Sequence, residues 1–360
     1  MVALVLMVAA LAAGVPPGVV IDHEPAAAGR YIGSPSLAIL RDGSYVASHD
    51  FFGPASNQSV SGVTRIFRSE DRGRTWQHLA ELKDQFWSNL FFCRGALYLM
   101  GTSCEYGRIV IRRSTDGGQT WTGPSFLTSE PNYHTAPVPL VVYKGRVWRA
   151  FEHHRPGAWG FFSALVLSAP EKADLLDAQS WTMTQPLPFP ADAPEGRHWL
   201  EGNVVIGPRG ELLDILRVDN IEKAALTRVE SNGLRFEGMI AFPGGAKKFT
   251  IRYDRKSRLY WALTNPAPGT ANPASVRNTL ALISSPDVRH WEVRKTILTH
   301  PDSLRHAFQY ADWQFDGRDL VVVSRTAFED EGGGAPRAHD ANFLTFHRVE
   351  RFRETRGSPQ

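Results

Sequence analysis

The sequence has little cysteine: Cys93 and Cys104 are the only two among 360 residues. Cys93 precedes a predicted turn at Arg94-Gly95, and Cys104 lies at the far end of the returning strand, which rises about 3.3 Å per residue. Two cysteines at that separation cannot form a disulfide without a shift of the backbone. We therefore expect two free, buried thiols. The chain also lacks a metal-binding motif, so we expect neither a metal nor a cofactor.

A strong charge imbalance is also absent, because 40 Lys and Arg residues against 37 Asp and Glu residues leave a net charge of +3. The basic residues are scattered without a run of five, which argues against nucleic acid or a membrane surface as a partner. A local positive site for an acidic ligand is compatible with this composition.

Long apolar runs are lacking except at residues 4–13. Ala10-Leu11-Ala12 inside this run has the small-x-small pattern of a cleavage site, and the run is too short to span a bilayer. We expect residues 1–14 to be a signal peptide and the mature protein to be secreted or periplasmic, with no integral membrane segment. A buried first strand is the structural alternative for the same residues.

A β-hairpin with a polar turn recurs six times at a spacing of roughly 40 to 65 residues, which indicates a repeat architecture. The six copies are residues 35–49, 89–103, 136–153, 201–217, 250–265 and 310–325. An apolar content of 42%, with 11% aromatic residues, is sufficient for a large core.

A second kind of turn follows several of these hairpins. Two full copies of Ser-x-Asp-x-Gly-x-Thr-Trp occupy residues 69–76 and 114–121, and a shortened copy occupies residues 285–291. The Asp can accept backbone N–H bonds, the Gly supplies a positive φ, and the Trp packs between neighbouring sheets. We assign these turns a structural role.

Six repeats of four strands predict an all-β fold, a six-bladed β-propeller formed as a single domain by residues 15–350. We expect residues 342–349 to close the ring with residues 19–21, and residues 351–360 to form a polar tail. The one helix that the sequence suggests covers residues 169–178. A pair of β-sandwiches is the alternative architecture.

In a propeller the starts of the innermost strands and the ends of the strands that follow meet on one face, around the axis. This set of positions is dense in basic and titratable side chains, which favours an anionic sugar as ligand. Strand starts contribute His134, Glu201, Lys247, Lys248, His306 and Tyr310, and strand ends contribute His49, Asp50, Glu152, His153, Arg217 and Arg325.

The repeated turn resembles the Asp-box of the sialidase (neuraminidase) superfamily, and the resemblance extends from about residue 31 to residue 348. In that family a Tyr nucleophile is paired with a Glu, three Arg bind the sugar carboxylate, and an Asp is the acid/base. The resemblance implies that Tyr310 is the nucleophile, Glu201 its partner, and Arg217 and Arg277 two of the carboxylate ligands.

Two positions depart from the family pattern. Gly33 stands where the family has its first Arg, unless Arg30 reaches the site, and Asn57 stands where the acid/base Asp is expected. An amide cannot protonate a leaving group. The candidates for a replacement proton donor are Asp50, Glu152, His134 and His153.

Substrate contacts are expected from residues around the same face. Besides Arg217 and Arg277, these are Arg325, Glu152, Trp199, Lys248 and His49, with Trp199 able to stack on a sugar ring beside Glu201. The structural alternatives are an ion pair between Glu201 and Arg217, a packed core tyrosine at position 310, and histidines that only satisfy hydrogen bonds.

A tyrosine is a poor nucleophile while neutral, since its reference pKa is about 10, but a neighbouring carboxylate can take its proton and guanidinium groups favour the phenolate. We therefore expect a secreted exo-acting glycoside hydrolase that removes a terminal acidic sugar from a glycan. One alternative is a hydrolase or lyase of uronic-acid glycans that uses His134 or His153. The other is a propeller that binds glycans without catalysis.

Overall fold

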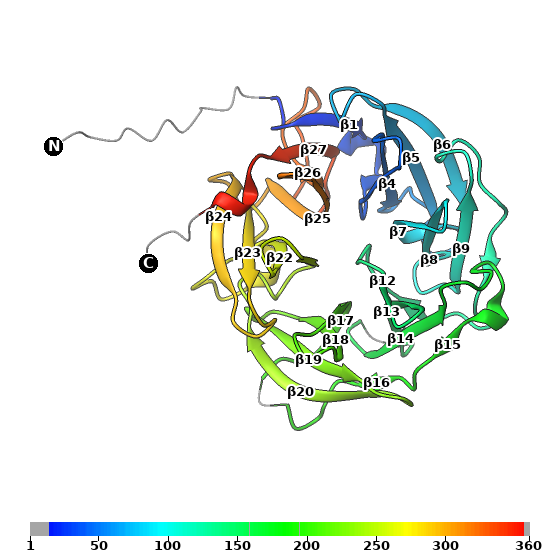
Figure 1. The fold of residues 1–360 in the computed structure, drawn as a ribbon. Coiled ribbons are helices and arrows are strands. Elements are labelled where there is room, and N and C mark those ends of the chain that lie inside the picture. The colour runs from blue at the N-terminus through cyan, green and yellow to red at the C-terminus, as the bar shows by residue number, and fades with distance from the viewer. Residues whose placement is uncertain (1–13, 158, 194, 356–360) are drawn as a thin grey trace.

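The computed structural model describes residues 14–157, 159–193 and 195–355. In this range six antiparallel sheets are arranged as blades around a central axis (Figure 1), which confirms the predicted six-bladed β-propeller. The predicted signal peptide lies outside the described residues except for Gly14. Within the described ranges, no helix has the length and apolar character needed to cross a membrane.

Blades 1 and 2 follow each other along the chain. Blade 1 consists of β2 (Tyr31–Ile32), β3 (Ser36–Ile39), β4 (Tyr45–Phe52), β5 (Val63–Ser69) and β6 (Gln77–Lys83). Blade 2 consists of β7 (Phe86–Cys93), β8 (Ala96–Thr102), β9 (Ile109–Ser114) and β10 (Ser125–Phe126). The innermost strand of blade 1 is divided between β2 and β3, which both pair with β4.

Blade 3 is the most irregular, since its inner and outer strands are both divided. It consists of β11 (Tyr133–His134), β12 (Val141–Tyr143), β13 (Arg146–His154), β14 (Phe162–Pro170), β15 (Thr182–Met183) and β16 (Leu187–Pro188). Blade 4 consists of β17 (Trp199–Ile206), β18 (Leu212–Val218), β19 (Lys223–Val229) and β20 (Leu234–Ala241).

Blades 5 and 6 complete the ring. Blade 5 consists of β21 (Thr250–Asp254), β22 (Leu259–Thr264), β23 (Thr279–Ser285) and β24 (Glu292–Thr299). Blade 6 consists of β25 (Ala307–Asp316), β26 (Asp319–Ala327), β27 (Phe343–Val349) and the N-terminal β1 (Val19–His23). β1 pairs antiparallel with β27, with Val19 opposite Phe346. The predicted closure of the ring is therefore confirmed.

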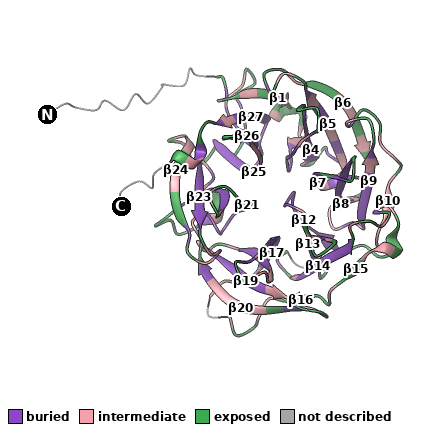
Figure 2. Cartoon of the chain, in the orientation of Figure 1, coloured by how far each residue is buried: buried purple, intermediate pink, exposed green. Residues whose placement is uncertain are grey.

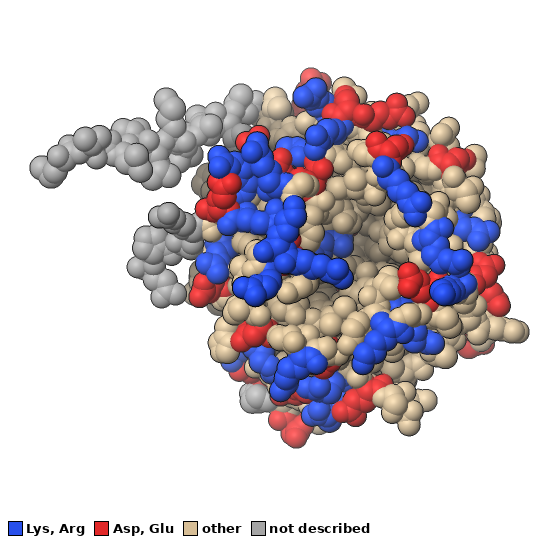
Figure 3. Space-filling view, viewed as in Figure 1, with Lys and Arg blue, Asp and Glu red and all other residues tan. Residues whose placement is uncertain are grey.

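The apolar side chains are packed between the blades. Leu320, Val321, Val322 and Val323 of β26 are all fully buried, whereas the outer strand β6 contains no buried residue. Figure 2 shows the same gradient, with buried residues concentrated on the strands nearest the axis. On the face shown in Figure 3, the surface is hollowed toward the axis, and Lys and Arg are interspersed with Asp and Glu around the rim.

The Asp-box turns have the expected hydrogen bonds. Asp71 Oδ1 accepts from the backbone N–H of Thr75 at 2.9 Å, and Trp76 packs on Phe346 of blade 6 with ring centroids 5.5 Å apart. In the shortened third copy, Val288 adopts φ 63°, the left-handed conformation that glycine adopts in the other two copies.

The predicted helix at residues 169–178 is wrong. Ala169 and Pro170 instead complete β14, where Ala169 is fully buried and lies opposite Val147 of β13. Pairing with β13 satisfies this backbone and buries the side chain, which outweighs helix propensity. The described residues contain only short 3₁₀ turns: η1 (Ala26–Ala28), η2 (Ala178–Ser180), η3 (Pro273–Ser275) and η4 (Phe352–Glu354).

The two cysteines are both free, as predicted, although Cys104 is only half-buried. At the other end of the chain, Phe352 is fully buried and lies 5.1 Å from the ring of Trp261 in blade 5. The tail that the sequence predicts from residue 351 therefore begins as a packed turn.

Candidate active site

A cavity of about 260 Å³ opens on the face where the inner strands start, and all six blades contribute to its lining. Seven of the predicted site residues line it: Asp50, His134, Glu201, Arg217, Arg277, Tyr310 and Arg325. Fifty or more residues separate several of these positions in sequence, so the ring closure is what brings them together.

Three β-bulges direct side chains into this cavity. The strand register shifts between Phe86 and Asn89 in β7, between Leu200 and Asn203 in β17, and between Gln309 and Asp312 in β25. In each bulge one residue has a left-handed backbone: Trp87 (φ 47°), Glu201 (φ 57°) and Tyr310 (φ 53°). Non-glycine residues avoid this conformation unless the surroundings enforce it, and bulges near active sites re-aim side chains.

Tyr310, Glu201 and Arg217 form a connected unit. The Tyr310 hydroxyl donates to Glu201 Oε1 at 3.0 Å, and Arg217 Nη1 donates to Glu201 Oε2 at 3.0 Å. Burial raises the pKa of Glu201, but the charges of Arg217 and His134 and the hydrogen bonds to the carboxylate outweigh burial and lower the pKa overall. Glu201 is therefore ionised at neutral pH and can accept the phenol proton.

Three buried guanidinium groups surround Tyr310. The guanidinium carbons of Arg277 and Arg325 lie 5.6 and 4.9 Å from the centre of its ring. Arg217 is connected to the Tyr310 hydroxyl through hydrogen bonds to Glu201. Burial lowers the pKa of Arg325 to about 10, and repulsion from Arg277 adds to this effect. All three remain charged at neutral pH. Arg325 Nε is buried without a hydrogen-bond partner within the described residues.

The third guanidinium does not come from the place that the family pattern suggests. Arg30 is bound to Glu24 at 2.9 Å and does not line the cavity, so Arg325 of β26 supplies the third positive charge instead. A Cβ at Gly33 would lie 1.7 Å from Asp50 Oδ1. The Asp50 carboxyl therefore occupies the space that a side chain at position 33 would need.

Asp50 is the cavity carboxyl with a raised pKa. Its two oxygens accept from the backbone N–H groups of Ser34 at 2.6 Å and Trp87 at 2.5 Å. Burial raises the pKa of Asp50 to about 6, although these two hydrogen bonds act in the opposite direction. A carboxyl with this pKa is protonated in part of the population near neutral pH, as proton donation requires.

The loop that contains Asn57 contributes a different residue to the cavity. Asn57 is exposed on the β4–β5 loop, whereas its neighbour Gln58 lines the cavity. Gln58 Nε2 donates to Glu105 Oε2 at 2.8 Å, and Glu105 itself lines the cavity. Glu105 follows β8 and is a second carboxyl at the site.

His134 lines the cavity and is held from behind by Glu152. Its Nδ1 lies 2.8 Å from Glu152 Oε2, and Glu152 Oε1 accepts from the backbone N–H of Gly202 at 3.0 Å. Glu152 is fully buried and outside the cavity lining. The sequence predicts that Glu152 contacts substrate or replaces the proton donor, whereas the structure places its carboxylate behind His134, where it connects His134 to the bulge at Glu201.

Four further predicted residues also lie outside the cavity lining. Trp199 is fully buried against Phe189, because it precedes the bulge that directs Glu201 into the cavity. Lys248 contacts the bulge in β25, where its Nζ donates to the carbonyl of Ala311 at 2.9 Å. The other two are His49, bound to Asp22 at 2.8 Å, and His153, packed on Tyr133.

Several cavity residues were absent from the sequence prediction. They are Phe52, Gln58, Trp87, Glu105, Tyr106, Trp159 and His339. Glu105 and Tyr106 lie two and three residues after the end of the predicted hairpin at residues 89–103. A search for site residues that extended three residues beyond each hairpin would have found them. Trp159 and His339 lie in loops whose course the sequence pattern does not specify. Burial lowers the pKa of His339 to about 3, so this histidine is neutral.

In the described part of the chain, one group of side chains has the spacing of metal ligands. The ligand atoms of His300, His306 and Glu329 lie within 4.8 Å of one another. The two histidine rings are stacked with their centroids 3.6 Å apart. This group lies outside the cavity lining and provides no group to the site described above.

No protein-family model matches the sequence, and no curated protein matches it. Solved structures do match over most of the chain. An α-L-arabinanase from Penicillium chrysogenum is 15% identical, with a TM-score of 0.60, and the match covers 94% of this chain and 98% of that one. The intramolecular trans-sialidase from Ruminococcus gnavus is 11% identical, with a TM-score of 0.62, and the match covers 94% and 98% of the two chains.

A third structure, a variant of the Trypanosoma rangeli sialidase with trans-sialidase activity, is 14% identical with a TM-score of 0.61. The match covers 88% of this chain and 54% of that one. At these identities the comparisons establish the fold. The chain is therefore a six-bladed β-propeller similar to those of sialidases and α-L-arabinofuranosidases.

Proposed function

We propose that the protein is a glycoside hydrolase of the sialidase type, which removes a terminal acidic sugar from a glycan. The observation that carries the proposal is the Tyr310–Glu201–Arg217 unit, joined by two hydrogen bonds of 3.0 Å. Tyrosine nucleophiles are characteristic of sialidases among glycosidases. The predicted secretion of the mature chain agrees with a substrate on extracellular glycans.

The reaction follows from the roles of these groups. Tyr310 Oη attacks the anomeric carbon while its proton passes to Glu201, and the bond to the leaving-group oxygen breaks as Asp50 donates a proton to that oxygen. Water then attacks the anomeric carbon and gives a proton to Asp50, while the bond between that carbon and Tyr310 Oη breaks and Tyr310 recovers its proton from Glu201. A neutral nucleophile avoids the repulsion that a carboxylate nucleophile would meet from an anionic sugar.

The charge of the site supports an acidic substrate. Arg217, Arg277 and Arg325 line a single small cavity, and each is at least 94% buried. A hydrogen bond to a charged group contributes about 1.5–3 kcal/mol. A sugar carboxylate would satisfy donors that a neutral sugar leaves unpaired.

A substrate comparison tests this proposal. We expect kcat/KM for a fluorogenic α-sialoside to exceed that for a fluorogenic α-L-arabinofuranoside by at least about 100-fold, the equivalent of two charge-assisted hydrogen bonds. The carboxyl methyl ester of the sialoside, which has the same shape without the charge, is the matched control substrate. Equal or faster turnover of the arabinofuranoside would contradict an acidic-sugar specificity.

Asp50→Asn tests the proton donor through its dependence on the leaving group. For sialyllactose, whose leaving group needs protonation, we expect kcat/KM to fall about 100-fold. For the aryl sialoside we expect less than about a fivefold loss, since a phenol leaves with little assistance. Asp174→Asn, which does not line the cavity, is the matched control. Equal losses on both substrates would exclude Asp50 as the donor and favour Glu105.

The pH dependence has a defined sign. The donor acts in its protonated form, so kcat/KM for sialyllactose should decrease as the pH rises above about 6, the pKa of Asp50. Asp50→Asn should remove this decrease. Glu201 must be ionised to accept the proton of Tyr310. Because the pKa of Glu201 is lowered from 4.5, kcat/KM should decrease on the acid side only below pH 4.5.

A second candidate is a lyase of uronic-acid glycans. It rests on the pair of His134 and Glu152, whose 2.8 Å contact orients a cavity imidazole for proton transfer. Release of a product that absorbs in the near ultraviolet from a uronic-acid glycan, with loss of that release in His134→Gln, would favour this reaction.

A further inference from the structure

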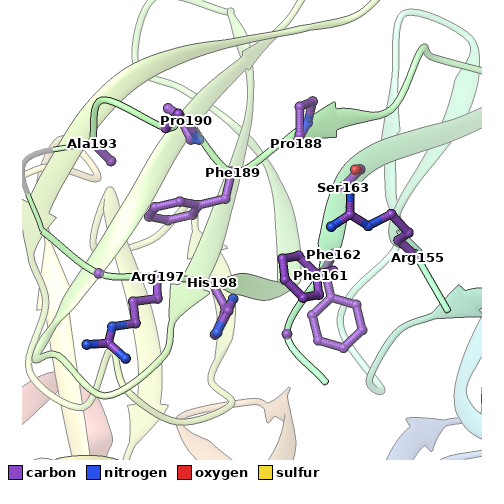
Figure 4. Close-up of a pocket in the computed structure, with 13 residues that line it drawn as sticks. Arg155, Phe161, Phe162, Ser163, Pro188, Phe189, Pro190, Ala193, Arg197 and His198 are labelled. Atoms are coloured by element: carbon purple, nitrogen blue, oxygen red, sulfur yellow. The ribbon is translucent and has the colours of Figure 1, made fainter. Parts of the chain in front are cut away.

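A groove of about 380 Å³ lies on the side of blades 3 and 4, between the end of β13, β16 and the segment that leads into β17. Its walls are aromatic and cationic, with Phe161, Phe189 and His198 around the centre and Arg155 and Arg197 at opposite sides (Figure 4). Phe161 and Arg197 are exposed. The groove shares no lining residue with the catalytic cavity.

The groove adjoins the catalytic cavity at Trp159. This residue lines the cavity, and its ring lies 5.7 Å from His198 and 6.2 Å from Phe162, both of which line the groove. His198 also lies three residues before Glu201, directly before the start of β17. A glycan that places its terminal sugar over Tyr310 and leaves the cavity past Trp159 therefore enters this groove.

The groove has a positive charge of its own. Its described lining contains Arg155, Arg197 and His198 and no carboxylate. The acids of the adjacent loop are Asp192, which is exposed, and Glu195, which is paired with Lys223. Arg155 lies over the ring of Phe161, with its Cζ 4.5 Å from the ring centre. Stacking surfaces combined with guanidinium groups suit a sugar ring with an anionic substituent.

We propose that this groove binds the second sugar of the substrate and selects an anionic one, carboxylated or sulfated, next to the acidic sugar that is removed. The inference rests on the proposed function for the direction of the chain, but the groove's affinity for an anionic sugar does not depend on turnover. The preferred substrate would then carry one negative charge for the Tyr310 cavity and another for Arg155 and Arg197.

The test uses two substrates that differ in the charge of the second sugar. These are sialyllactose, whose second sugar is a neutral galactose, and its analogue with a 6-sulfated galactose. We expect the wild type to prefer the sulfated substrate by at least about tenfold in kcat/KM, and the preference to decrease as salt rises. In R155A/R197A the ratio should fall to near unity. A ratio cancels any general loss of active enzyme.

The matched control is R255A/R318A, which removes two exposed arginines from turns on the opposite face and should keep the preference. A wild-type ratio near unity, or an unchanged ratio in R155A/R197A, would overturn the inference.

A binding experiment separates the groove from the reaction. The lactose with a 6-sulfated galactose, which lacks the sialic acid, is titrated into the protein and binding is followed by tryptophan fluorescence. If no substrate is hydrolysed but R155A/R197A weakens this binding at least tenfold, the proposed function fails and the groove assignment stands. If the wild type does not bind the sulfated disaccharide, the groove assignment fails.

Discussion

Tyr310→Phe is expected to lower kcat/KM for a fluorogenic sialoside by at least on the order of 10³-fold, because the substitution removes the atom that attacks the sugar. The ring remains between Arg277 and Arg325, so KM should change much less than kcat. The aryl substrate makes the test independent of the proton donor, and steady-state kinetics with single-turnover measurements would locate the loss in the chemical step.

Tyr143→Phe is the matched control for this variant. The Tyr143 hydroxyl donates to the carbonyl of Gly210 at 2.7 Å, so its loss also removes one hydrogen bond, but from a residue that does not line the cavity. Full activity in Tyr143→Phe together with the loss in Tyr310→Phe would assign the effect to the site. Tyr310→Phe with more than about a tenth of wild-type activity would contradict a tyrosine nucleophile.

Glu201→Gln is expected to reduce kcat/KM for the same substrate by a similar factor. The amide can still accept a hydrogen bond, but it cannot take the proton of Tyr310. Because the two residues act as one unit, the double variant should lose little more than either single variant. Multiplicative losses in the double variant would show that the residues act independently.

The same variant should also lower the free energy of unfolding, by about 3 kcal/mol, since Arg217 keeps its buried charge without a counter-ion. The pKa of Glu201 is lowered in the folded state, so its contribution to stability is complete above pH 4.5 and is lost as the pH falls through the folded-state pKa. The difference between wild type and Glu201→Gln in urea unfolding should therefore be full at pH 7 and decrease in acid. A difference that is independent of pH would mean that Glu201 carries no stabilising charge.

The fold was predictable because its signals are local. The turns at residues 69–76 and 114–121 each contain the Asp, Gly and Trp that make their own hydrogen bonds and packing, and six hairpins at a regular spacing leave few architectures. The pairing of residues 19–21 with the last strand followed from the need to close the ring. The helix expected at residues 169–178 failed because pairing between β14 and β13, which involves a distant segment, decides the conformation of Ala169.

The sequence by itself also placed Glu201, Arg217 and Tyr310 at this face from the hairpin repeat, and the resemblance to the sialidase superfamily added Arg277; all four line the cavity. The tertiary structure decided which neighbours share the cavity with them. A bulge reverses the side of the strand to which a residue points, so Trp87 and Glu201 face the axis while Trp199 faces the core. Gly33 had suggested a missing charge, but three-dimensional packing puts Asp50 beside it and brings Arg325 from another blade. Asp50 and Arg325, which line the same cavity, are 275 positions apart along the chain, and no local pattern of residues encodes such contacts.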